Sequence, residues 1–182
     1  MTTSTTEIPG YTSGTWDIDP VHSNVTFTVR HLGVSKVRGR FDTVEGTIVT
    51  GDTVHKSSVT ATIQATGVNT NNEQRDGHIR SADFLDADTH QTLTFASTGV
   101  REDDGEFFID GDLTLHGVTK PVTLKAEIGG FGDHPSGSKV LGVSAKTEIS
   151  RAAFEVGPTI PGAVVSDKIT IELDIEAGQQ QA

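Results

Sequence analysis

Apolar and polar residues alternate at every second position along most of the chain, and this pattern restricts its fold more than any other feature. Val25, Phe27 and Val29, for example, alternate with polar neighbours. A period of two places one set of side chains on one face of an extended strand. We therefore predict about nine strand segments with one buried face, at residues 15–19, 25–30, 41–50, 59–64, 92–98, 107–115, 122–128, 141–149 and 169–175.

So many half-buried strands require a closed barrel or a sandwich, since a single open sheet would leave its apolar face in water. Long segments joined by short turns such as Asp104-Gly105 favour an up-and-down arrangement. We predict an all-β fold, an antiparallel β-barrel of about eight strands. Such a barrel has a lumen that side chains or one slender ligand can fill. Small residues such as Ala61 and Ala126 favour a cavity, although periodicity alone leaves a filled core equally open.

Residues 69–88 interrupt the alternation and are rich in residues that a helix tolerates. Asn71 or Asn72 could cap the start of a short helix, and Ser81 could begin a second turn. Gly77 weakens the first helix. We predict a short helical insert at about residues 71–86 that covers the barrel as a lid or plug.

The length of 182 residues fits one domain. Residues 1–14 and 177–182 are polar, so we expect flexible ends around a folded domain at residues 15–176. The first residues lack the basic and apolar segments of a secretory signal, and the chain contains no cysteine. Both features predict a cytoplasmic location.

Composition excludes several functions. The chain carries 25 acidic and 14 basic residues, a net charge of −11, which argues against binding to nucleic acid. No apolar run approaches the roughly 20 residues of a transmembrane helix. Without cysteine there is no thiolate nucleophile and no cysteine-ligated zinc site.

Catalytic signatures are also missing from the sequence. It contains no G-x-S-x-G elbow and no glycine-rich phosphate loop. The seven histidines show neither the H-x-H nor the H-x-x-x-H spacing that places two imidazoles on one metal ion. We predict no catalytic residue, no metal and no cofactor, and we interpret Arg75-Asp76 as a structural ion pair. An enzyme that uses histidines or Asp76 as acid and base stays open as an alternative.

A basic strip stands out against the acidic composition. Residues 30–40, RHLGVSKVRGR, contain four basic residues and no acidic one. Lys36, Arg38 and Arg40 share one side of an extended chain. Such a strip could bind an anionic head group, with Arg38 and Arg40 as the candidates and His31 as a third. The alternative is a solvated strand face that discourages edge pairing.

Several separated motifs follow one another between residues 15 and 176. They are Trp16-x-Ile18-Asp19-Pro20-x-His22-Ser23-x-Val25-x-Phe27, Val29-Arg30-His31-Leu32-Gly33, Val37-x-Gly39-x-Phe41, Arg75-Asp76-x-His78-Ile79-Arg80-Ser81-x-Asp83-Phe84 and Gly111-Asp112-Leu113-Thr114-Leu115-His116-Gly117-Val118-Thr119. Together they resemble the YceI-like, polyisoprenoid-binding protein family. The resemblance implies an extended lipocalin-like barrel that holds a long isoprenoid chain, without catalytic residues, and it makes a homodimer plausible. The chain departs from the family pattern at His90-Gln91 and at residues 151–157, changes that could reshape the mouth of the barrel.

We therefore predict a carrier of a long-chain lipophile such as a polyisoprenoid, a prenyl diphosphate or a quinone tail. A filled barrel that serves as an interaction or stress-response module is a further alternative. Strand alternation and the placement of aromatic residues predict a ligand-binding lining of Phe27, Val29, Phe41, Ile63, Phe95, Leu113, Leu124, Val143, Phe154 and Ile171.

Overall fold

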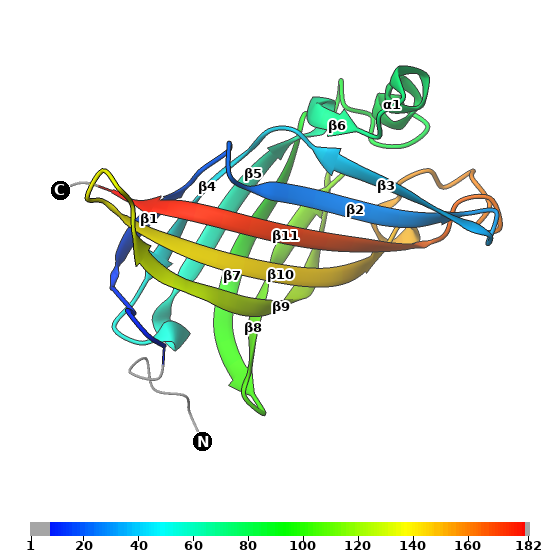
Figure 1. Cartoon of the computed structure of the whole chain (residues 1–182). Helices are drawn as coiled ribbons and strands as arrows, with labels where there is room; N and C mark the ends of the chain where they lie inside the picture. The colour runs from blue at the N-terminus through cyan, green and yellow to red at the C-terminus, as the bar shows by residue number, and fades with distance from the viewer. Residues whose placement is uncertain (1–7, 181–182) are drawn as a thin grey trace.

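The computed structural model describes residues 8–180 and shows strands wrapped around a barrel (Figure 1). Three one-turn 3-10 helices, at Val54–Lys56, Ala65–Gly67 and Ala152–Phe154, lie between strands. The main elements are β1 (Gly14–Ile18), β2 (Asn24–His31), β3 (Ser35–Phe41), β4 (Val44–Thr50), β5 (Ser58–Gln64), β6 (Val68–Asn69), α1 (Glu73–Arg80), β7 (Thr92–Asp103), β8 (Glu106–Leu115), β9 (Val118–Asp133), β10 (Lys139–Ser150) and β11 (Lys168–Gln179).

The strands form a closed antiparallel barrel. Neighbouring strands follow the order β1-β4-β5-β7-β8-β9-β10-β11, and pairing of β11 with β1 closes this ring of eight. Strands β2, β3 and β6 continue β1, β4 and β5 beyond short breaks. Strand β11 accordingly pairs with β1 near its end and with β2 near its start. The prediction of an all-β barrel of about eight strands is confirmed.

Close approach of two strands requires glycine at one position in the barrel wall. A Cβ atom added to Gly46 on β4 would lie 2.2 Å from the carbonyl oxygen of Thr60 on β5. No side chain can fit at that distance. This glycine therefore allows β4 to approach β5 closely, next to the β1 edge that closes the barrel.

The short helical insert is present as α1, beside β6 at one edge of the barrel (Figure 1). Asn72 caps its start, because the Asn72 side chain accepts a hydrogen bond of 2.9 Å from the Arg75 backbone N–H. The expected ion pair between Arg75 and Asp76 is wrong. Buried Asp76 instead accepts hydrogen bonds from the Thr70 backbone and hydroxyl, and Arg75 donates to the Thr70 hydroxyl and carbonyl.

Both expected flexible ends extend too far into the folded domain. Ala177 is fully buried, and residues 177–179 of β11 pair with β1. Tyr11 stacks edge-on against Phe131 and donates a 2.8 Å hydrogen bond to the Gly51 carbonyl. Pairing of residues 177–179 with β1 closes the barrel, a role that the partly polar composition of this segment conceals. The remaining parts of the two expected ends, residues 1–7 and 181–182, lie outside the described residues.

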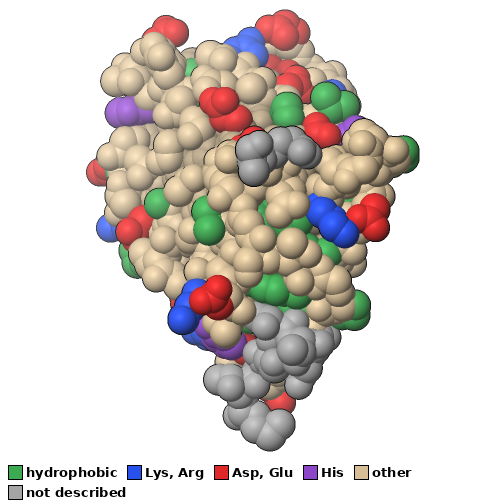
Figure 2. Space-filling model, turned by 90° about the vertical axis from the view of Figure 1, so that its left-hand side faces the viewer, with side chains coloured by type: hydrophobic (Ala, Val, Ile, Leu, Met, Phe, Trp, Pro, Cys, Tyr) green, Lys and Arg blue, Asp and Glu red, His purple; other side chains and the backbone are tan. Residues whose placement is uncertain are grey.

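Trp16 anchors the end of the barrel where the two ends of the chain meet. Its side chain is fully buried, packs with Leu141 and Ala177, and donates a 2.9 Å hydrogen bond to the hydroxyl of Thr50. On the outside of this end, hydrophobic side chains show as small separate areas among acidic and basic ones (Figure 2). Among the described residues, no helix has the length and hydrophobicity needed to cross a bilayer.

Candidate ligand-binding site

An apolar cavity of about 510 Å³ lies inside the barrel. Each of the eleven strands contributes to its lining, and most of the lining side chains are hydrophobic. The volume falls in the range of about 300–1,000 Å³ that is typical of sites for small molecules. The barrel is therefore hollow rather than filled, as the small inward-facing residues indicated.

All but one of the predicted lining residues face this cavity. The exception is Phe154, which lies in the 3-10 helix after β10 and is buried in the core beside the cavity. Strand alternation does not apply in this helix. The prediction that Phe154 lines the cavity depended on its aromatic side chain alone and is wrong. The residues that line the cavity as expected are Phe27, Val29, Phe41, Ile63, Phe95, Leu113, Leu124, Val143 and Ile171.

Two of the aromatic side chains lie over glycines in neighbouring strands. A Cβ atom added to Gly39 would be 2.4 Å from the ring of Phe27, and one added to Gly111 would be 2.4 Å from the ring of Phe95. Each ring therefore occupies the space that a side chain would take at the barrel wall. This arrangement keeps the rings close to the wall and leaves the lumen free.

Further lining residues lie on the same inward faces but were not among those predicted. They follow the same alternation, so a complete inward list from the sequence would have included them. Ala126 and Ala145 face each other across β9 and β10, and their small side chains widen the lumen. Other additions are Val25, Ile109, Leu173 and Ile175.

The cavity continues to the end of the barrel formed by the β2–β3 turn and the loop at residues 151–167. Val29, Val37 and the exposed His31 line it there, together with Val165 of the loop. A backbone bridge between His31 and Val165 joins the turn to the loop. We call this end the mouth of the cavity.

Arg151 holds the loop at the mouth and was missed as a site residue. Its side chain is buried, and its guanidinium group uses all five N–H donors. Each donor reaches a backbone carbonyl of the same loop. The acceptors are Ser166 at 3.2 Å from Nε, Val156 at 3.0 Å and Gly157 at 2.6 Å from Nη1, and Ile160 at 3.1 Å and Val165 at 2.8 Å from Nη2.

The three predicted head-group residues do not meet at one point. His31 lines the cavity, whereas Arg38 and Arg40 do not contact it. Gly39 between the two arginines is buried, so alternation places both arginine side chains on the outer face of β3. There they line an outer depression with Lys36, and Arg40 donates a 2.8 Å hydrogen bond to Asp42.

The chain is similar to known proteins over nearly its whole length. The model of the YceI-like domain matches residues 16–177. The chain belongs to the YceI-like family. Protein YceI of Shigella flexneri is 40% identical over 167 residues, which cover 91% of this chain and 86% of that protein.

Solved structures of YceI-like proteins share the barrel. The YCEI protein of Campylobacter jejuni superposes with a TM-score of 0.76 at 29% identity, over 84% of this chain and 90% of the other. A polyisoprenoid-binding domain from Saccharophagus degradans superposes with a TM-score of 0.71 over 93% of this chain and all of the other. The second pair is 16% identical, so it shows a common fold alone.

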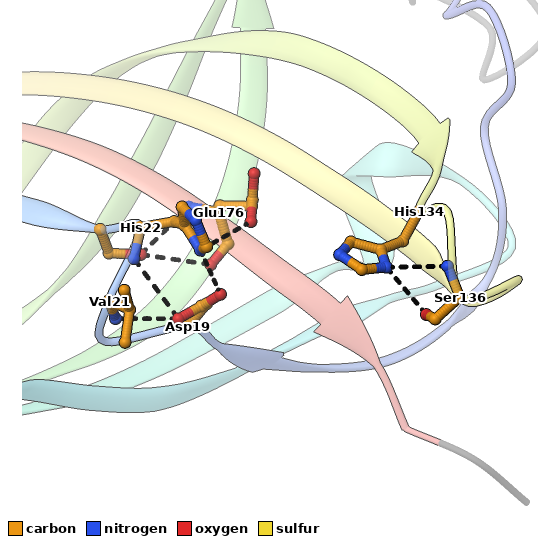
Figure 3. Close-up of polar contacts among 7 residues, drawn as sticks. Asp19, Val21, His22, His134, Ser136 and Glu176 are labelled. Atoms are coloured by element: carbon orange, nitrogen blue, oxygen red, sulfur yellow. Dashed lines mark hydrogen bonds and ion pairs between the residues drawn. The ribbon is translucent and has the colours of Figure 1, made fainter.

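The YceI-like motif around Asp19 and His22 forms the break between β1 and β2 (Figure 3). Asp19 Oδ1 accepts hydrogen bonds from the backbone N–H groups of Val21 and His22. His22 Nδ1 lies 2.7 Å from Asp19 Oδ2 and 3.4 Å from Glu176 Oε2. Ser23 exchanges hydrogen bonds with the backbone of Glu176. These contacts fasten the strand break to β11, which explains the motif by structure rather than by chemistry.

The charges at this strand break predict a measurable increase in the pKa of His22. Hydrogen bonding to Asp19, with the Glu176 charge nearby, raises the pKa of His22, and the His22 hydrogen bond lowers the pKa of Asp19. The pair therefore contributes stability between about pH 4 and 6.5, which is lost as pH rises through the raised pKa of His22 or falls through the lowered pKa of Asp19. NMR titration of the imidazole should show the raised value, and Asp19→Asn should bring it back towards 6.5. An unchanged His22 titration in that variant would contradict the assignment.

Within residues 8–180, two groups of side chains could supply three donor atoms each to a metal ion. One is Asp19, His22 and Glu176. The other is Asp86, His90 and His116, whose donor atoms lie within 4.8 Å of one another. The Nδ1 atom of His116 is buried without a hydrogen-bond partner in the structure. Folding assembles both groups from residues whose sequence spacing carries no metal signature.

The enzyme alternative depends on a histidine–carboxylate pair within the cavity. His31 and His78 are the histidines of the described chain that contribute to the lining. His78 lies 3.0 Å from Asp83, and both side chains are more than half exposed at the edge of the helical insert. The pair therefore lies in solvent at the edge of the insert and not inside the lumen. The geometry favours binding over acid–base chemistry.

Proposed function

We propose that this protein is a carrier that binds one long-chain lipophile inside the barrel. The observation that supports this function is the continuous apolar cavity to which every strand contributes. Transfer of a hydrocarbon chain from water into such a cavity gains about 0.8 kcal/mol per methylene and needs no reactive group. A polyisoprenoid, a prenyl diphosphate or a quinone tail fits this chemistry. The similar barrel of the Saccharophagus protein, described as polyisoprenoid-binding, agrees with the proposal.

The proposed ligand lies with its tail among Phe27, Phe95 and Ile171 and its polar end at the mouth. His31 and Arg30 line the mouth and are exposed, so they can meet a polar group without burying a charge. Arg38 lies outside the lumen and would contact a phosphate only where the head group emerges. Arg40 shares that outer position.

We propose a binding role without catalysis or a cofactor for this chain. The chain has no cysteine and therefore no disulfide, which agrees with the predicted cytoplasmic location; the location stays a prediction. A homodimer also stays a prediction.

Native mass spectrometry tests the proposal. Protein freed of lipid is incubated with a long-chain polyprenol or a menaquinone and then measured. We expect one ligand per protein molecule, and no stable adduct with a short water-soluble isoprenoid alcohol, because little apolar surface is then buried. Protein that takes up none of the long-chain prenyl lipids would contradict the proposed function.

A further inference from the structure

Large hydrophobic side chains are exposed at the mouth of the cavity. In the β2–β3 turn, Leu32 is 55% exposed and Val34 is 82% exposed. The Leu32 backbone N–H donates a 2.9 Å hydrogen bond to the carbonyl of Val164, whose side chain is 38% exposed. This contact ties the turn to the loop that Arg151 holds. We call Leu32, Val34 and Val164 the apolar tip.

The backbone of the turn makes the leucine still less expected. Leu32 has a φ of +55°, in the left-handed region, and Gly33 follows with +70°. Glycine and asparagine adopt this conformation readily, whereas a bulky apolar residue there is uncommon. The chain therefore keeps a leucine in a position where both exposure and backbone conformation favour another residue. Such a combination is typical of a residue retained for a contact.

Exposed basic residues lie beside the apolar tip on β2 and β3. Arg30, Lys36 and Arg38 flank the turn and are exposed, and none has an ion pair in the part of the chain that the structure describes. Residues 30–40 include no acidic residue, although the whole chain has a net charge of −11. Lys168, on the same outer face, lies 3.5 Å from Glu148. The β2–β3 hairpin is thus a local cationic segment of an acidic protein.

We propose that the apolar tip and its three unpaired cations dock on an anionic lipid bilayer. Peripheral membrane binding combines apolar side chains that enter the interface with basic residues that attract anionic head groups. Both components occur here within one hairpin. Exposed leucine and valine side chains beside unpaired cations match the two components of such a surface.

Docking in this orientation would place the mouth against the bilayer. Val29, His31 and Val165 line the cavity directly behind the tip. A lipid could then pass between bilayer and lumen with little exposure of its tail to water. This consequence rests on the proposed carrier function, whereas the docking itself does not.

Sedimentation with lipid vesicles tests the docking. We expect the full chain to bind vesicles of phosphatidylcholine mixed with phosphatidylglycerol and to bind pure phosphatidylcholine much less. Binding should weaken as the Debye length falls from about 10 Å at 0.1 M salt to about 3 Å at 1 M. Equal binding to both kinds of vesicle would overturn the electrostatic part of the proposal.

Variants of the tip give a sharper test. Leu32→Asn with Val34→Ser should lower vesicle affinity at least tenfold, and asparagine suits the left-handed backbone, so folding is preserved. Lys36→Gln and Arg38→Gln should each lower it about fivefold. The matched control changes the 82% exposed Val21 to serine and Lys125 to glutamine, away from the mouth, and should bind as the wild type does. An equal loss of vesicle affinity in the control variant would overturn the assignment of the apolar tip as the docking surface.

Light scattering separates the bilayer from a second copy of the chain as the occupant. We expect the wild type and the Leu32→Asn, Val34→Ser variant to have the same oligomeric state. A dimer that this variant abolishes would overturn membrane docking and assign the tip to a protein interface. A protein that binds vesicles but takes up no prenyl lipid would support docking and contradict the carrier function, so the two failures are distinguishable.

Discussion

Replacement of Arg151 by lysine should lower the free energy of unfolding by about 3–5 kcal/mol, the cost typical of breaking a buried charged network. The guanidinium group donates hydrogen bonds to five backbone carbonyls of one loop. Nη1 and Nη2 each donate to two of them, and Nε donates to the fifth. A lysine ammonium group has only three donors at one point and cannot span these acceptors. For a chain of this size, the melting temperature should fall by about 6–20 °C.

Thermal unfolding and hydrogen exchange measure this effect. Exchange should increase first at the loop of residues 151–167, because its carbonyl groups lose their common donor. Arg101→Lys is the matched control. Arg101 is half exposed, donates to Asp110, and lies over the ring of Phe108, so its replacement should cost less than about 1 kcal/mol. Equal losses for the two variants would contradict the role of Arg151.

Replacement of Ala145 by phenylalanine should weaken lipid binding by about 200-fold while the protein stays folded. Ala145 faces Ala126 across the lumen wall, and both line the cavity. A benzyl group there would displace about four ligand methylenes, each of which contributes about 0.8 kcal/mol. Overpacking of a filled core would cost stability, but here the ring enters empty space.

Ala96→Phe is the matched control for this variant. Ala96 lies on β7, next to the inward-facing Phe95, and is exposed on the outer face. The same ring added there should leave lipid affinity unchanged. Fluorescence titration with a prenyl quinone compares the three proteins, and melting curves establish that each is folded. Unchanged affinity in Ala145→Phe would place the ligand outside the barrel.

Alternation predicted the barrel and most of its lining because a closed wall imposes the same physical rule on every strand. Phe27 and Ile171 face each other across β2 and β11, as their inward positions require. The same rule places Val37 and Phe41 on one face of β3 and Arg38 and Arg40 on the other face. The two arginines could therefore not share the lumen with these residues, and their proposed head-group role was in conflict with the pattern.

Features that depend on contacts between distant segments could not be predicted in this way. Arg151 looks ordinary in the sequence, since its five acceptors become neighbours only when the loop folds back. Residues 177–179 are polar in part, yet their pairing with β1 closes the barrel. The His90 and His116 rings, 4.9 Å apart, come from the end of the insert and from the β8–β9 turn. Spacing rules for metal ligands apply only to residues that are close in the sequence, so they do not detect this pair.

The binding of a long-chain lipophile inside the barrel is tested most directly by a crystal structure of the protein with a long-chain polyprenol. We expect continuous density along the lumen, in contact with Phe27, Phe95 and Ile171, with its polar end at His31. Density confined to the outer surface, or a lumen filled only by water after saturation with the lipid, would contradict the carrier function.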